Sequence, residues 1–304
     1  MHVSIFAGAI AVVASSASAQ LVTSITQPIF GLNPPEVFFT DVSSGANSFL
    51  FDPSGIPSTA GGFGGLAADE VGRRLFGSVR NGPQDDLYAL DYATLTPTRI
   101  GQINVGGAGL SVDGLAYDTA GSRLFATRGL GTGGNAEGLF LVDQNTGSAS
   151  LLLEYDAGGS SDFTFNAIDY DPLTGLVYLV DEDTTGGTGI WSYDPNSGVG
   201  GALSFVADLA PGVTDVDGLG AGDGRLYLVS DSNPDGNGGQ HAVFDLLSNQ
   251  YVDFLDSPHP PYTTGTPFGT INVSAAGAFA PGIPTPGVAG VLALGGVLAA
   301  RRRR

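Results

Sequence analysis

Short runs of alternating apolar and polar residues fill most of the chain, and they recur at a regular interval. Five segments share a pattern of an apolar residue, two small or polar residues and another apolar residue: 63–67, 112–116, 165–169, 216–220 and 268–272. The steps between their first residues are 49, 53, 51 and 52 residues. A fixed period near 50 residues indicates a repeat architecture.

Each copy continues with further strand patterns separated by Gly, Asn and Asp turns. The second apolar runs cover 74–78, 123–127, 176–180 and 225–229, and the third runs cover 86–91, 138–143, 189–194 and 241–245. Fourth runs follow, for example at 99–103 and 150–154. The period-2 pattern predicts antiparallel four-stranded units. Four strands in about 50 residues are typical of the blade of a β-propeller, so the sequence predicts an all-β propeller.

The two ends of the repeat region complement each other. We expect 268–280 to supply the first two strands of a last blade, and 36–42 and 47–52 to supply the other two. Joining both ends in this way predicts a closed ring of five blades without a free edge. The alternative is six blades, with 21–31 contributing to an additional one. A β-sandwich is disfavoured by five aligned copies at one spacing, and helix signals are confined to the termini.

The N-terminus has the pattern of a secretory signal peptide. An apolar run at 5–13 is followed by the small residues Ala17, Ser18 and Ala19. This order predicts cleavage between Ala19 and Gln20, with an ordinary buried helix as the alternative.

The C-terminus combines a Pro-rich motif, an apolar run and a basic end. Pro284, Thr285, Pro286 and Gly287 precede the uncharged run 288–300, and Arg301, Arg302, Arg303 and Arg304 follow it. The apolar run would span about 20 Å as a helix, which predicts a short transmembrane helix with its arginines on the cytoplasmic side. This tail resembles the PEP-CTERM sorting signal, although Thr285 stands where that family usually has Glu. The resemblance implies recognition and cleavage by an exosortase-like membrane protease; a plain membrane anchor is the alternative.

These signals divide the chain into four parts: a signal peptide at 1–19, a β-propeller at 20–280, a linker with the sorting motif at 281–286, and the apolar helix with its Arg tail at 287–304. We therefore expect an exported protein of the cell envelope or outer surface. It would be anchored in the membrane before its tail is processed and could be released afterwards.

Composition narrows the chemistry. The chain has no cysteine, which excludes disulfides, thiolate metal sites and a cysteine nucleophile. It also has no lysine, and the predicted mature part carries 7 arginines against 30 acidic residues, a net charge of −23. Such a surface repels nucleic acid and anionic lipid, and it favours cations, above all Ca²⁺ outside the cell.

Two sets of oxygen-bearing residues are candidates for binding Ca²⁺. Asp113 and Asp217 precede inner strands at one repeat position, together with Asp162, Asn166 and Asp215, and we expect them around one mouth of the central channel. The second set is Asp231, Asn233, Asp235 and Asn237, whose spacing matches the opening of a calcium loop. Ala242 replaces the acidic residue that would close such a loop. The alternative for both sets is turn capping, in which Asp and Asn bond to nearby backbone.

Catalytic patterns are absent from the sequence: no Ser-His-Asp order, nucleophile elbow or His pair with metal-ligand spacing is evident. Trp191 is expected to pack within a blade. The sequence thus favours a non-enzymatic binding or structural propeller whose partners are the processing protease, the membrane, and extracellular polysaccharide or surface proteins. The alternative function is a Ca²⁺-dependent hydrolase, similar to lactonase propellers, with its site at the channel mouth.

Overall fold

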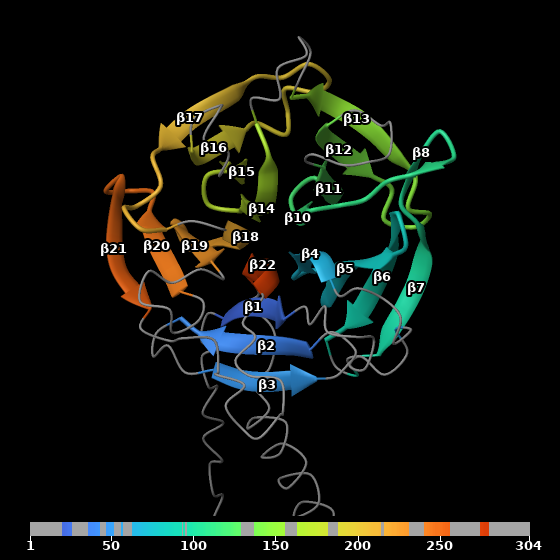
Figure 1. Ribbon diagram of the computed structural model, residues 1–304, viewed down its shortest axis with the longest axis horizontal. Coiled ribbons are helices and arrows are strands. Elements are labelled where there is room, and N and C mark those ends of the chain that lie inside the picture. The colour runs from blue at the N-terminus through green and yellow to red at the C-terminus, as the bar shows by residue number, and fades with distance from the viewer. Residues whose placement is uncertain are drawn as a thin grey trace, which may run out of the picture.

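The computed structural model describes residues 20–25, 36–42, 47–51, 56, 63–92, 94, 96–128, 137–155, 163–181, 188–213, 216–230, 240–255 and 274–279. These residues form β-strands and turns, with no helix among them. The strands assemble into four-stranded antiparallel sheets arranged around a common centre (Figure 1). The predicted all-β propeller built from four-stranded antiparallel units is confirmed.

Four of the sheets are each formed by one continuous stretch of chain. The first contains β4 (Phe63–Asp69), β5 (Arg74–Asn81), β6 (Gln84–Asp91) and β7 (Pro97–Gln102). The second contains β10 (Gly114–Asp118), β11 (Arg123–Arg128), β12 (Gly138–Val142) and β13 (Ala149–Glu154). The third contains β14 (Phe165–Asp171), β15 (Leu176–Asp181), β16 (Gly189–Tyr193) and β17 (Leu203–Ala207). The fourth contains β18 (Val216–Gly222), β19 (Arg225–Ser230), β20 (Gln240–Asp245) and β21 (Gln250–Leu255).

A further four-stranded sheet combines both ends of the described chain. Its order is β22-β1-β2-β3, with β22 (Ser274–Phe279), β1 (Gln20–Ile25), β2 (Glu36–Asp41) and β3 (Asn47–Phe51). A small hairpin, β8 (Asn104–Val105) and β9 (Ala108–Gly109), lies between the first and second sheets. The inner strands contact one another in the cyclic order β4, β10, β14, β18, β22 and back to β4.

The composite sheet corrects two details of the sequence prediction. The C-terminal copy supplies one described strand rather than two, and β1 supplies the second strand of the sheet. Residues 20–25 therefore do not belong to an additional sixth blade. The inner strand lies at 274–279 and does not begin at Phe268, and it brings a glycine to the place where inner strands meet. A Cβ at Gly277 would lie 3.0 Å from the backbone N of Leu219, and a Cβ at Gly65 would lie 2.5 Å from the backbone N of Leu115.

The core lies between neighbouring sheets and follows the period-2 alternation of their strands. Leu124 and Ala126 of β11 pack with Phe76 of the first sheet, whereas Phe125 packs with Ile168 of the third sheet. Each sheet thus buries both of its faces, which is why the inner strands are almost wholly buried.

Turns at the end of each third strand use the aspartates that the sequence placed there. Asp143 Oδ1 accepts hydrogen bonds from the backbone N of Asn145 and Thr146, and Asp194 Oδ1 accepts one from the backbone N of Asn196. Asp91 and Asp245 accept equivalent bonds from Thr94 and Ser248. These side chains cap tight turns, as expected for Asp at such positions.

Candidate functional site

The two ends of the ring are here called the upper face, where the inner strands begin, and the lower face, where they end. In an antiparallel blade, the turns joining strands one to two and three to four lie on the lower face. The connections joining strands two to three, and one blade to the next, lie on the upper face.

Asn166 and Asp217 share one structural position on the inner strands. The pairing register shifts between Phe165 and Ala167 in β14 and between Val216 and Gly218 in β18, which makes the intervening residue a β-bulge. Bulges redirect side chains and are common beside functional sites. Both residues border a space of about 130 Å³ on the ring axis, which also touches Gly65, Gly114 and Gly277. The space is too narrow for a water molecule, so the axis is closed at this level.

Asp113 occupies the equivalent position in the second sheet, immediately before β10. Its carboxylate lies 3.8 Å from Arg80 Nη2, and its side chain is about one-quarter exposed. Among the described residues, no group of three or more His, Asp and Glu side chains gathers as a metal site would require. A calcium ion shared by Asp113 and Asp217 stays a prediction.

The remaining predicted site residues lie outside the described part of the chain. They are Asp231, Asn233, Asp235 and Asn237 of the calcium-type loop, Asp162 and Asp215, the residue Ala19 before the cleavage point, and the tail residues Pro284, Thr285, Pro286, Gly287, Arg301, Arg302, Arg303 and Arg304. Gln20 is described and begins β1. No helix among the described residues is long and apolar enough to cross a membrane.

Asp85 is a buried carboxyl group that sequence reasoning did not single out. It lies on β6 at the upper end of the contact between the first two sheets, where its Oδ2 accepts a hydrogen bond of 3.0 Å from the backbone N of Val112. Burial raises the pKa of Asp85 to about 7, although the Val112 bond opposes the shift. Asp86, its neighbour, faces the other way and forms two hydrogen bonds with Arg99, which hold the pKa of Asp86 below its usual value.

Asp169 is a second buried carboxyl group, and it links three inner strands. Its Oδ2 accepts hydrogen bonds from the backbone N of Ala221 in β18, at 2.7 Å, and of Phe279 in β22, at 3.1 Å. Its Oδ1 accepts a bond from the backbone N of Tyr170. Burial raises the pKa of Asp169 to about 8. Its bonds to inner strands give this carboxyl group a role in closing the ring.

Buried polar groups gather at the upper ends of the second and third sheets. We call them the polar rim: Thr127, Arg128, Glu137, Tyr155, Thr164 and Trp191. Each has a buried side-chain nitrogen or oxygen that makes no hydrogen bond with the described residues. In Arg128 both Nε and Nη1 are in this state, although the residue is only 3% exposed. Most buried polar groups in proteins are hydrogen-bonded, so these atoms are candidates for bonds to a further partner.

Contacts along the second and third sheets connect four members of the polar rim: Arg128, Glu137, Tyr155 and Trp191. Arg128 pairs with Gly138 across the ladder, next to Glu137, and the backbone N of Tyr155 bonds to Glu137 O at 3.1 Å. The Tyr155 and Phe165 rings are 4.7 Å apart, and Phe163 lies 5.5 Å from Phe165. Phe163 in turn meets Trp191 edge-on at 5.0 Å. Trp191 also packs against Phe205, in agreement with its expected place within a blade.

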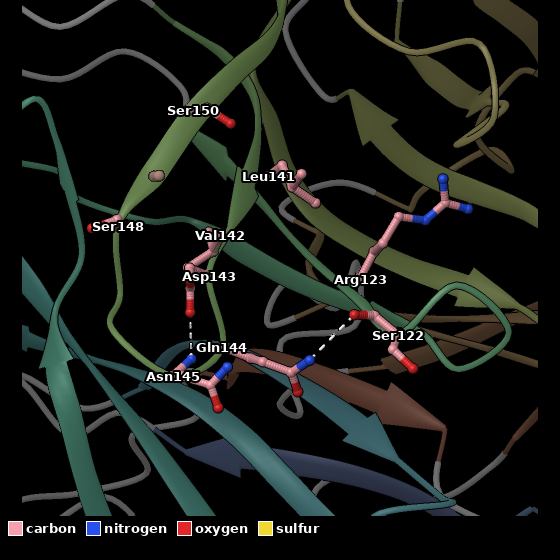
Figure 2. Close-up of a pocket in the computed structure, with 10 residues that line it drawn as sticks. Ser122, Arg123, Leu141, Val142, Asp143, Gln144, Asn145, Ser148 and Ser150 are labelled. Carbon is pink, nitrogen blue, oxygen red and sulfur yellow. Dashed lines mark hydrogen bonds between the residues drawn. The ribbon is translucent and has the colours of Figure 1, made fainter.

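A pocket of about 450 Å³ opens on the lower face of the second sheet (Figure 2). Its wall is the turn after β12, in which Asp143 Oδ1 accepts the backbone N–H of Asn145 and Gln144 Nε2 donates to Ser122 O (Figure 2). Gln144 Oε1 also accepts a bond from Arg74 of the first sheet. The polar side chains that line the pocket therefore hold the turn in place and join the two sheets.

Arginines that begin the second strands form related bridges. Arg123 bonds to Asp118 of its own sheet and to the backbone oxygen of Pro195 in the next sheet, at 2.5 Å. Arg74 repeats the arrangement with Asp69 and Gln144. The repeated Arg-Leu-Phe sequence at 74–76 and 123–125 is the pattern from which these bridging arginines could have been predicted.

No protein-family model matches the chain, and no curated protein matches it. Solved structures do match. A chain in the crystal structure of a nidogen/laminin complex aligns with a TM-score of 0.52 at 14% identity, over 86% of this chain and 98% of that one. TolB from Acinetobacter baumannii aligns with a TM-score of 0.50 at 13% identity, over 80% of this chain. This chain spans about half of that TolB chain, 54%. At such identities the likeness supports the propeller fold alone.

Proposed function

We propose that this chain is an exported envelope protein whose five-bladed propeller binds a ligand without catalysing a reaction, and which is sorted through a PEP-CTERM-like tail. The boundaries of the folded part support the export and sorting steps. β1 begins at Gln20, directly after the predicted signal cleavage. β22 ends at Phe279, two residues before the predicted linker at 281. The described strands that close the ring therefore include neither of the two predicted processing segments.

The processing step is tested by mass spectrometry of the C-terminus, from intact cells and from the medium. We expect the terminus to lie near Pro286 after cleavage. Recovery of Arg304 from mature surface protein would refute cleavage by an exosortase-like protease and leave a plain anchor.

The observation that carries the binding role is the polar rim. Nε and Nη1 of Arg128 are buried without a hydrogen bond to the described residues, which costs folding free energy, and an anionic partner would offset that cost. Arg is suited to this because its planar fork can bind both oxygens of a carboxylate. Phe163 and Thr164, at the start of the third sheet, are partly exposed and add an aromatic face and a hydroxyl group of the kinds that sugars contact. The ligand that matches this chemistry is a polysaccharide with a carboxylate for Arg128, and the net charge of −23 opposes its binding, so this contact has to outweigh the repulsion.

Arg128→Met distinguishes a binding residue from a structural one. Met has a similar length without the charge, so the variant should unfold at the same or a higher urea concentration than the wild type. It should also bind a uronate-containing polysaccharide at least about tenfold more weakly by calorimetry, since a charge-assisted bidentate pair is worth more than 1.4 kcal/mol. Arg80→Met, on the same face with an exposed guanidinium, is the matched control. Loss of stability with unchanged binding would assign Arg128 to the fold.

One observation favours the second candidate, a Ca²⁺-dependent hydrolase. Asp85, with its pKa raised to about 7 by burial, lies close enough to Asp113 for their charges to interact, and a carboxyl group with that pKa could transfer protons. Such an enzyme should lose lactonase or esterase turnover in Asp113→Asn and Asp217→Asn. Calorimetry with Ca²⁺ that gives no heat for the wild type would remove this candidate.

A further inference from the structure

The lower face carries nearly all of the strongly exposed large hydrophobic side chains of the described residues. Val71 is 80% exposed, Leu173 62%, Val199 81% and Leu247 82%. Val71 and Leu173 lie in turns between first and second strands, and Val199 and Leu247 in turns between third and fourth strands. All four turns belong to the lower face. Of the five such side chains among the described residues, only Phe205 lies outside these turns, so the exposed apolar groups are unevenly divided between the two faces.

The chain leaves the ring at this same face, next to two of these side chains. The Phe279 ring at the end of β22 covers Gly222 at the end of β18, so both inner strands end together. Two residues further on, a Cβ at Gly224 would lie 3.1 Å from Leu173 and 3.8 Å from Leu247. Leu173 and Leu247 therefore border one spot, and the C-terminal segment departs beside it.

The length of the segment limits how far the apolar run at 288–300 can be from this face. Eight residues, 280–287, separate Phe279 from the run, and three of them are proline. At about 3.1 Å per residue they reach about 25 Å. If the run is in a bilayer, the lower face is held at the membrane surface at a high effective concentration.

We propose that the lower face, through Leu173, Leu247, Val71 and Val199, rests on the outer surface of the membrane that holds the C-terminal run. The inference depends on the proposed anchoring of the tail. A net charge of −23 opposes adsorption of the free propeller, so docking requires the tether and ends when the tail is cleaved. Val71 has exposed Arg73 in the same turn, whose charge suits phosphate groups of the lipid. The exposed carboxylates of Asp91, Asp143 and Asp194 lie on the same face and would be repelled by anionic lipid, so the membrane surface that fits is zwitterionic.

The absence of cysteine allows a direct test with the full-length chain. Leu247→Cys on the lower face and Pro83→Cys in the upper-face turn after β5 are each labelled with an environment-sensitive dye. The proteins are reconstituted into phosphatidylcholine vesicles, with and without nitroxide lipid. We expect the dye at 247 to shift to the blue and to be quenched, and the dye at 83 to do neither.

A second variant measures how much the two leucines contribute to membrane docking. It combines Leu173→Ser and Leu247→Ser with a dye at Val71→Cys. Burial of one leucine changes an equilibrium about tenfold, so the docked fraction reported at 71 should fall strongly while the protein still floats with the vesicles. Flotation with equal signals at 247 and 83 would overturn docking and leave the anchor standing. Failure to float would overturn both proposals. A blue shift at 247 without vesicles that grows with protein concentration would assign the face to a second copy of the chain and overturn membrane docking.

Discussion

Asp169 should make the propeller lose stability as the pH rises from 4 to 8. Its carboxyl group is buried, and its pKa in the folded state is about 8 against 3.8 for an exposed aspartate. A group with a raised folded pKa contributes stability that is fully present below its unfolded pKa and is lost as the pH rises through its folded pKa. The folded protein thus binds a proton that the unfolded chain has already released. This is the reverse of the ordinary acid unfolding of proteins.

The size of the effect follows from the shift. Each pKa unit corresponds to about 1.4 kcal/mol, so the free energy of unfolding falls by about 4 kcal/mol between pH 4 and pH 7 through Asp169. Asp85, with a folded pKa of about 7, acts in the same direction over the same range. For a domain of this size, 4 kcal/mol corresponds to about 10 °C in melting temperature.

Asp169→Asn isolates the contribution. Asn is neutral at every pH, and its carbonyl oxygen can accept the bonds from Ala221 and Phe279, while its amide group meets the Tyr170 N–H less favourably than an oxygen. Urea unfolding from pH 4 to pH 8 should therefore show a variant less stable than the wild type at pH 4 but equal or superior at pH 8. Asp85→Asn combined with Asp169→Asn should remove most of the remaining slope. Wild-type stability that rises over this range, or an unchanged slope in Asp169→Asn, would refute the reasoning.

Three further predictions concern the ring and its bridges. Gly65→Ala should destabilise the protein by about 3 kcal/mol or more in urea unfolding, and more than Gly277→Ala, because the added Cβ meets rigid backbone at 2.5 Å rather than 3.0 Å. Arg123→Met should cost about 1–2 kcal/mol, since it removes the positive charge paired with buried Asp118. Arg225→Met should cost clearly less, because Arg225 is half-exposed and lies 3.7 Å from Asp245; equal losses would contradict the bridging role. Arg99 holds the pKa of Asp86 below its usual value, so the stability from this pair is present above pH 4 and is lost as the pH falls further. In Arg99→Gln, the free energy of unfolding should therefore change less between pH 5 and pH 2 than it does in the wild type.

The repeat made the strands predictable because its signals are local. Alternation, Gly turns and an Asp after each third strand act over a few residues, and the observed β6, β12, β16 and β20 agree closely with the predicted third strands. The last inner strand was misplaced because Phe268 matched the repeat spacing. Its true position depends on Gly277 meeting Leu219, a contact between strands far apart in sequence.

The buried polar groups were not predictable for the same physical reason. Asp85 and Asp113 are both aspartates near the start of a strand, yet Asp85 is fully buried and Asp113 is partly exposed beside Arg80. Arg128 follows an apolar strand, where an exposed arginine is the usual expectation. Burial depends on which sheet packs against which, and neighbouring residues along the chain do not encode it.

The misplaced strand also matters for function, because it decides which face the tail leaves. Inner strands run from the upper to the lower face, so one C-terminal strand, β22, brings Phe279 to the lower face. Two C-terminal strands, as the sequence predicted, would have returned the chain to the upper face, which is the face that carries Arg128. An anchored tail would then have turned the polar rim towards the membrane and closed it to a polymer. Closure with a single C-terminal strand instead directs the polar rim outward, so the proposed ligand binding and the proposed anchoring are compatible in one molecule.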